Sequence, residues 1–69
     1  MMHYMEVSAE SLAHEIGVRI KQERSTRRWT LDHLAEVAGV SRRMLVKVEQ
    51  GSVNPSIGTL LRLSDALGI

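Results

Sequence analysis

The spacing of apolar residues along the chain predicts four helices joined by short loops. In the first helix, Leu12, Ile16 and Ile20 recur every fourth residue, as the core-facing stripe of a helix does. Ser8 or Ser11 would cap the start of this helix. The β-branched residues seldom alternate with polar ones, so the pattern does not indicate a half-buried sheet.

The next two helices are short and lie on either side of a tight turn. Thr30 would cap the first of them, and Gly39 would end it in a left-handed conformation. Ser41 would cap the following helix, and Gly51 would stop it. Six apolar residues of the pair have helical spacing and should point inward: Leu31, Leu34, Ala35, Ala38, Leu45 and Val48.

A fourth helix is predicted in the segment SIGTLLRLSDALG, after the loop SVNP. It would begin at Ser56, or at Asn54 with Pro55 as the first helical residue, and Gly68 would close it. Its apolar face would comprise Ile57, Leu60, Leu63 and Leu67. We therefore expect an all-α fold of four helices over residues 11–69, with residues 1–10 forming an N-terminal tail and the start of the first helix.

The two short helices satisfy the geometry of a helix-turn-helix. Helices joined by a tight turn cross steeply, so only a small side chain fits where their axes approach, and the turn needs a positive φ. Ala35 and Gly39 meet these two requirements. An ordinary helical hairpin would seldom combine both with a surrounding set of apolar positions.

Charge adds a functional indication to this fold. The 69 residues have a net charge of +1 and no Cys, which fits one small domain without disulfides. Residues 19–69, however, hold nine bases against five acids, a net charge of +4. Within the third helix, Arg42 and Arg43 oppose the helix dipole by about 0.3–1 kcal/mol each, which favours an external polyanion as their partner. Arginine forks match O6 and N7 of guanine in DNA.

From Ile16 to Ile69 the chain resembles the Cro and phage-repressor helix-turn-helix family (XRE-type transcriptional regulators). The resemblance lies in "IGVRIKQER", "WTLDHLAEVAGVSRRMLVKVEQG" and "NPSIGTLLRLSDALGI". It implies a compact four-helix bundle, or a five-helix bundle that lacks its last helix. The helix of residues 41–50 would lie in the DNA major groove, and the helix that starts at Thr30 would cross the DNA backbone.

The resemblance also implies roles for individual residues. Four residues of the third helix would contact base edges: Arg42, Arg43, Val46 and Lys47. Five residues at helix starts and in the last loop would contact phosphates: Thr30, Leu31, Ser41, Asn54 and Ser56. Arg24 and Glu49 match a structural ion pair that many relatives contain, and with Ala35 and Gly39 they form the structural set.

The chain differs from the family pattern at two positions and in the segment at which its sequence ends. Relatives often have Leu where Glu23 stands and Gly where Arg28 stands, so the end of the first helix should be looser or its turn different. Relatives also tend to continue past "ALGI". The chain is then either the N-terminal domain of a longer regulator with a C-terminal effector-sensing domain, or a minimal form that pairs differently.

Other chemistries find little support. His3, His14 and His33 have no helical partner at i, i+4, so we expect no metal site, and no phosphate loop or nucleophile motif indicates an enzyme or a cofactor. Trp29 should pack against the next turn rather than stack on a base. No apolar run is long enough for a membrane span, so the protein should be cytoplasmic.

Together these observations predict a non-catalytic, sequence-specific binder of double-stranded operator DNA, acting as a homodimer, with repression as the default sign. The alternative is a protein-interaction or antitoxin-type module, in which the helix-turn-helix is a scaffold and the basic face binds an acidic partner. Steep salt dependence and a preference for one DNA sequence would distinguish the first function from the second.

Overall fold

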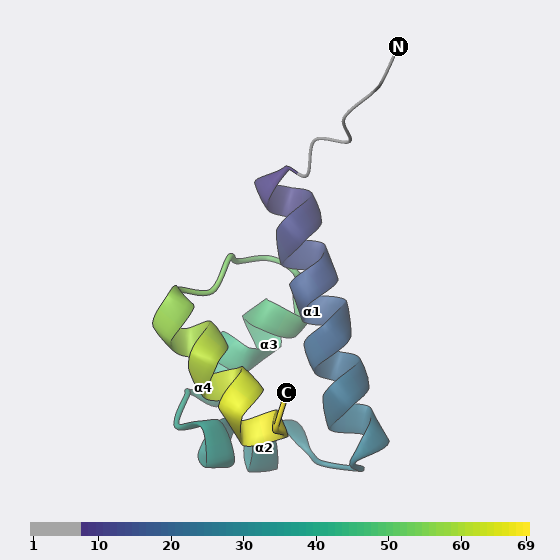
Figure 1. Ribbon diagram of the computed structural model, residues 1–69, viewed down its shortest axis with the longest axis vertical. Helices are drawn as coiled ribbons and strands as arrows, with labels where there is room; N and C mark the ends of the chain where they lie inside the picture. The colour runs from purple at the N-terminus through teal and green to yellow at the C-terminus, as the bar shows by residue number, and fades with distance from the viewer. Residues whose placement is uncertain (1–7) are drawn as a thin grey trace.

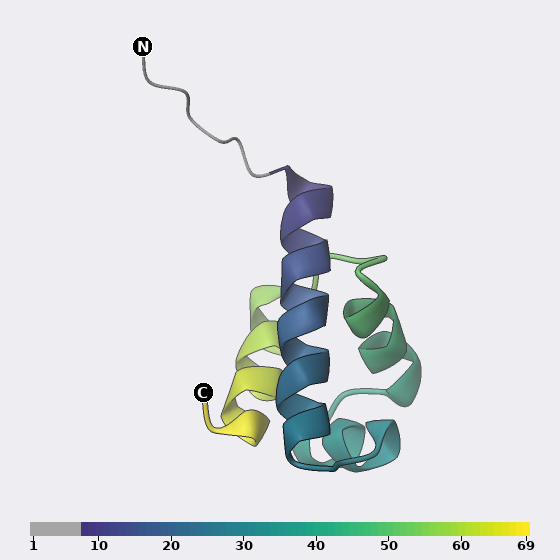
Figure 2. The same cartoon turned by 90° about the vertical axis from the view of Figure 1, so that its right-hand side faces the viewer.

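Helices account for most of residues 8–69, the part of the chain that the computed structural model describes (Figure 1). They are α1 (Ala9–Thr26), α2 (Leu31–Ala38), α3 (Arg42–Gln50) and α4 (Ile57–Leu67). In the view of Figure 2, α1 stands in front, with α4 to its left, α3 to its right and α2 at the base. The expected all-α fold of four helices is confirmed for these residues. The division of the chain at residue 10 stays a prediction, and residues 1–7 and His3 lie outside the described part.

Hydroxyl side chains cap the start of all four helices. Each cap accepts a hydrogen bond from the backbone N–H three residues later, at 3.0–3.1 Å. This satisfies an N–H group that has no partner within the helix. The caps are Ser8, Thr30, Ser41 and Ser56, so Ser8 rather than Ser11 begins α1, and Ser56 rather than Asn54 begins α4.

The core lies where α2, α3 and α4 meet the second half of α1. Four side chains are fully buried there: Leu34, Leu45, Val48 and Leu63. Two residues that the periodicity placed in the core are instead exposed, Leu12 by 48% and Ile57 by 78%. Leu12 lies on the first turns of α1, which extend beyond the other helices (Figure 1), and Ile57 is the first residue of α4. Neither position has a facing helix to cover it. No helix within residues 8–69 is long and apolar enough to cross a membrane.

A glycine allows α1 and α3 to approach each other closely. Gly17 is buried, and a Cβ atom there would overlap the carbonyl oxygen of Val48 and lie 2.8 Å from that of Glu49. Both obstacles are backbone atoms, so the two helices would have to separate to admit a side chain. The periodicity of the sequence gave no indication of this contact.

An ion pair fixes the same two helices farther along. The Arg24 guanidinium donates to both carboxylate oxygens of Glu49, at 2.7 and 2.9 Å, and to the carbonyl oxygen of Trp29 at 2.9 Å. The two side chains are only 15% and 7% exposed. The hydrogen bonds that Arg24 donates to Glu49 raise the pKa of Arg24, against the effect of burial. Arg24 and Glu49 thus form the pair that the resemblance implies, and Arg24 also holds the loop before α2.

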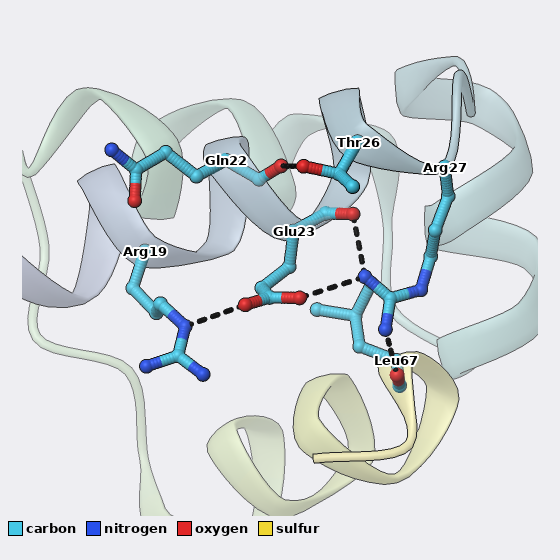
Figure 3. A network of polar contacts seen from close by, with 6 residues as sticks. All are labelled: Arg19, Gln22, Glu23, Thr26, Arg27 and Leu67. Atoms are coloured by element: carbon cyan, nitrogen blue, oxygen red, sulfur yellow. Dashed lines mark hydrogen bonds and ion pairs between the residues drawn. The ribbon is translucent and has the colours of Figure 1, made fainter.

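A second polar network ties the end of α1 to the end of α4 (Figure 3). Glu23 pairs with Arg27 and Arg19, both at 2.8 Å, and Arg27 also donates to the Leu67 carbonyl oxygen. The hydrogen bonds from Arg27 and then Arg19 lower the pKa of Glu23. The following turn uses left-handed backbone although residue 28 is Arg, with φ 58°. The end of α1 is therefore anchored and not loose, although the chain has Glu23 and Arg28 at these two positions.

We predict that Gly17→Ala destabilises the protein, although Ala favours a helix over Gly by about 1 kcal/mol. Overpacking typically costs about 1–3 kcal/mol, so the overlap with the α3 backbone should outweigh that gain and leave a net loss of up to about 2 kcal/mol. Urea unfolding followed by circular dichroism measures the change. Gly58→Ala is the matched control, since a Cβ there would meet only the Ser56 hydroxyl at 3.9 Å. Equal stability of the two variants would contradict the close contact.

The Glu23 network predicts a pH dependence. Because the pKa of Glu23 is lowered in the folded state, the ionised carboxylate stabilises the fold at pH values above its ordinary pKa of about 4.3. This contribution is lost as the pH falls through the lowered pKa. Glu23→Gln should therefore unfold at lower urea concentration than the unmodified chain at pH 7, and the gap should close near pH 2. Glu15→Gln is the matched control, since it removes an exposed carboxylate of α1 that forms no ion pair within residues 8–69.

Candidate nucleic-acid interface

The turn between α2 and α3 is built as the sequence predicts. Gly39 has φ 71° and ψ 32°, and the N–H of Val40 donates to the carbonyl oxygen of Ala35 at 3.0 Å. Ala35 itself is 5% exposed and belongs to the core. A larger side chain at this position would push the two helices apart, so the small residue and the glycine together set the steep crossing of α2 and α3.

The inward side of α3 determines what its outward side presents. Leu45 and Val48 are fully buried. The four candidate base-contacting residues lie on the opposite side, within about 140° of the helix circumference at about 100° per residue. They are Arg42, Arg43, Val46 and Lys47, of which the two arginines are exposed and the other two are half-buried.

The cations of this outward side differ in their surroundings. The Nε atom of Arg42 lies 3.0 Å from Oδ1 of Asp32, in the first turn of α2, and both side chains remain largely exposed. Arg43 and Lys47 have no carboxylate within ion-pair distance in the part of the chain that the structure describes. One of the three cations therefore contacts one of the protein's own acids, and two do not.

The candidate phosphate-contacting residues lie at both ends of α3. Thr30, Leu31 and Ser41 belong to the starts of α2 and α3, whose first turns the Asp32 ion pair brings together. Asn54 and Ser56 are exposed and belong to the segment that leads into α4. Figure 2 shows α3 along one edge of the molecule, with α2 beyond its first turn and this segment beyond its last turn. Backbone N–H groups at helix starts attract anions, so both ends can accept phosphate.

A shallow depression accompanies this edge. It is lined by residues of α1, α2 and α3, namely Lys21, Arg24, Leu31, Val46, Glu49 and Gln50. Sequence reasoning did not single out Lys21, Gln50 or Asp32, the partner of Arg42, because neither the helical periodicity nor the family resemblance gave these residues a role. The sequence indicated only that Asp32 is an acid in the first turn of a helix, where it is favourable, and this gives no hint of its pairing with Arg42.

Other kinds of site receive no support from the geometry. No group of three His, Asp or Glu residues within residues 8–69 could hold a metal ion. His14 and His33 are exposed, and the ring of His33 packs edge-on against Trp29 with ring centres 4.7 Å apart. Trp29 is partly buried against the core, as expected for the position before a helix cap.

Three curated proteins with similar sequences are named as transcriptional regulators or repressors. The chain is 37% identical over 60 residues to the HTH-type transcriptional regulator SutR of Escherichia coli (strain K12), covering 87% of this chain and 34% of SutR. It is 44% identical over 54 residues to an immunity repressor protein of Bacillus phage phi105, covering 78% of this chain and 38% of the repressor. It is 42% identical over 55 residues to the HTH-type transcriptional regulator SinR of Bacillus subtilis (strain 168), covering 78% and 50%.

These relatives are transcriptional regulators by name, and the chain spans half of their length or less. Residues 20–69 match the sequence model of the helix-turn-helix family, which includes the turn at Gly39 and the whole of α3. The match, the buried Ala35 and the left-handed Gly39 agree, and the chain belongs to the Cro and phage-repressor (XRE-type) helix-turn-helix family.

Proposed function

We propose that this chain is the sequence-specific, non-catalytic DNA-binding domain of a transcriptional regulator, with α3 in the major groove of double-stranded DNA. The observation that carries the proposal is the division of α3 into two sides. Leu45 and Val48 are committed to the core, so Arg42 and Arg43 necessarily face outward with Val46 and Lys47 beside them. The major groove admits a helix, and its base edges offer acceptors to arginine and methyl groups to Val46.

Phosphate contacts would position the domain on the duplex. Thr30, Leu31 and Ser41 would hold one stretch of backbone beside the start of α3, and Asn54 and Ser56 would hold another beyond its end. These groups carry no sequence information, whereas the outward residues of α3 do. The net charge of +4 over residues 19–69 would strengthen binding to any duplex.

The regulator would act as a homodimer that represses transcription. One recognition helix reads only one half-site, and a dimer doubles the contacted sequence at a spacing of about 34–36 Å. The phage phi105 relative is named an immunity repressor, which favours repression as the sign of regulation. Since the aligned relatives are longer than this chain, a C-terminal effector-sensing domain would complete the regulator.

The proposal is tested by selecting duplexes from a library with a random stretch of about 20 base pairs, at two salt concentrations. A sequence-specific domain should enrich one motif and lose affinity with a slope near −0.9 per phosphate contacted. Weak binding without an enriched motif would contradict the proposal and favour the protein-interaction or antitoxin-type alternative.

Arg43→Ala should relax recognition at one base pair. Because a bidentate arginine contact discriminates by about 1–3 kcal/mol, the variant should lose that amount on the selected duplex and tolerate all four bases at one position. Binding to a set of singly substituted duplexes measures this. Arg19→Ala removes an exposed arginine on the α4 side of α1 (Figure 3) and should leave the base preference intact. An unchanged preference for Arg43→Ala would show that Arg43 does not read a base.

Ser56→Ala should weaken binding to every duplex by about the same factor, since phosphate contacts are independent of sequence. The substitution also removes a helix cap worth about 1 kcal/mol, so binding must be measured well below the unfolding temperature. Ser8→Ala removes the equivalent cap of α1, far from α3, and should leave DNA binding unchanged. A loss at a single base position for Ser56→Ala would contradict its assignment to phosphate.

A further inference from the structure

An acid of α2 contacts a candidate base-contacting residue. Asp32 Oδ1 lies 3.0 Å from Nε of Arg42, and this ion pair joins the first turn of α2 to the first residue of α3. The side chains are 78% and 60% exposed. An ion pair with this exposure contributes little to the stability of a fold, because solvent screens it and two long side chains must be ordered. A structural role therefore explains little of why the pair lies on this surface.

The geometry of the guanidinium group indicates a different role. Arginine has five N–H donors in a rigid plane, and the guanidinium nitrogen that forms the ion pair with Asp32 is Nε. The edge formed by Nη1 and Nη2 remains available, and it can fork around O6 and N7 of guanine. An exposed arginine without a partner samples many rotamers, whereas a carboxylate on a neighbouring helix limits the directions in which this edge can point.

We propose that Asp32 is a positioning residue for DNA recognition: its carboxylate orients the Arg42 guanidinium so that the Nη edge meets a base pair. This inference rests on the proposed function. Asp32 also places a negative charge beside the DNA phosphates, which lowers affinity for every duplex. This general loss leaves the ratio between correct and incorrect duplexes unchanged, so Asp32 increases discrimination only by fixing the direction of Arg42.

The test uses the full chain, the duplex selected above and its singly substituted versions. Asp32→Ala should reduce discrimination at the base pair that Arg42→Ala affects, by about threefold or more, as expected for coupled side chains. It should at the same time increase affinity for unrelated duplexes, and this gain should shrink at high salt. In a chain that already has Arg42→Ala, Asp32→Ala should change no base preference.

Glu36→Ala is the matched control. It removes the same charge from an exposed position one turn along α2, and Glu36 forms no ion pair within residues 8–69. It should leave the base preference unchanged at every position. Both variants should remain folded, with unfolding curves close to that of the unmodified chain, and Asp32→Ala should be slightly the less stable because it loses a favourable acid in the first turn of α2.

The outcomes separate this proposal from the proposed function. If Arg42→Ala changes a base preference and Asp32→Ala does not, the positioning role is wrong and DNA recognition by α3 stands. If Asp32→Ala changes the preference equally with and without Arg42, Asp32 contacts a base itself and the positioning role is again overturned. If the unmodified chain enriches no motif, the proposed function fails first.

Discussion

The contact between α1 and α3 is the constraint on which the orientation of α2 and of the outward side of α3 depends. The lack of a side chain at Gly17 lets the backbones of α1 and α3 come into contact. Farther along α1, Arg24 donates hydrogen bonds to both carboxylate oxygens of Glu49. Both contacts involve the last turn of α3, and they hold it against α1 at two positions along α1. Because α2 is bound to α3 by a short turn and to α1 through the Trp29 carbonyl oxygen, its orientation follows from theirs. The direction of the outward residues of α3 is therefore set by the packing of α3 against α1.

Local chemistry explains why so much of the fold could be predicted from the sequence. A hydroxyl that accepts a hydrogen bond from the N–H three residues later needs no distant partner. Thr30 and Ser41 therefore indicate helix starts independently of the tertiary structure. Gly39 and Gly51 likewise tolerate positive φ through their own lack of a side chain. The helix bounds and the turn between α2 and α3 depend on such rules alone.

The features that could not be predicted all depend on distances between elements. Helical periodicity puts Leu12 in line with Ile20, but it does not say how far the other helices extend along α1. Gly17 in a helix reads as a weak helix former until a second backbone lies against it. The pairing of Asp32 with Arg42 requires the crossing angle of two helices, which the residue types do not encode individually. The Arg24 and Glu49 pair was foreseen only through the family resemblance.

The separation of α3 into a core side and an outward side affects how such a protein can evolve. Leu45 and Val48 are fully buried, while Arg42 and Arg43 are exposed and Lys47 is half-buried. Substitutions can therefore accumulate on the outward side without eroding the stability reserve that the packing supplies. Under the proposed function, a gene duplicate would acquire a different binding preference through a few substitutions, each of which leaves the domain folded.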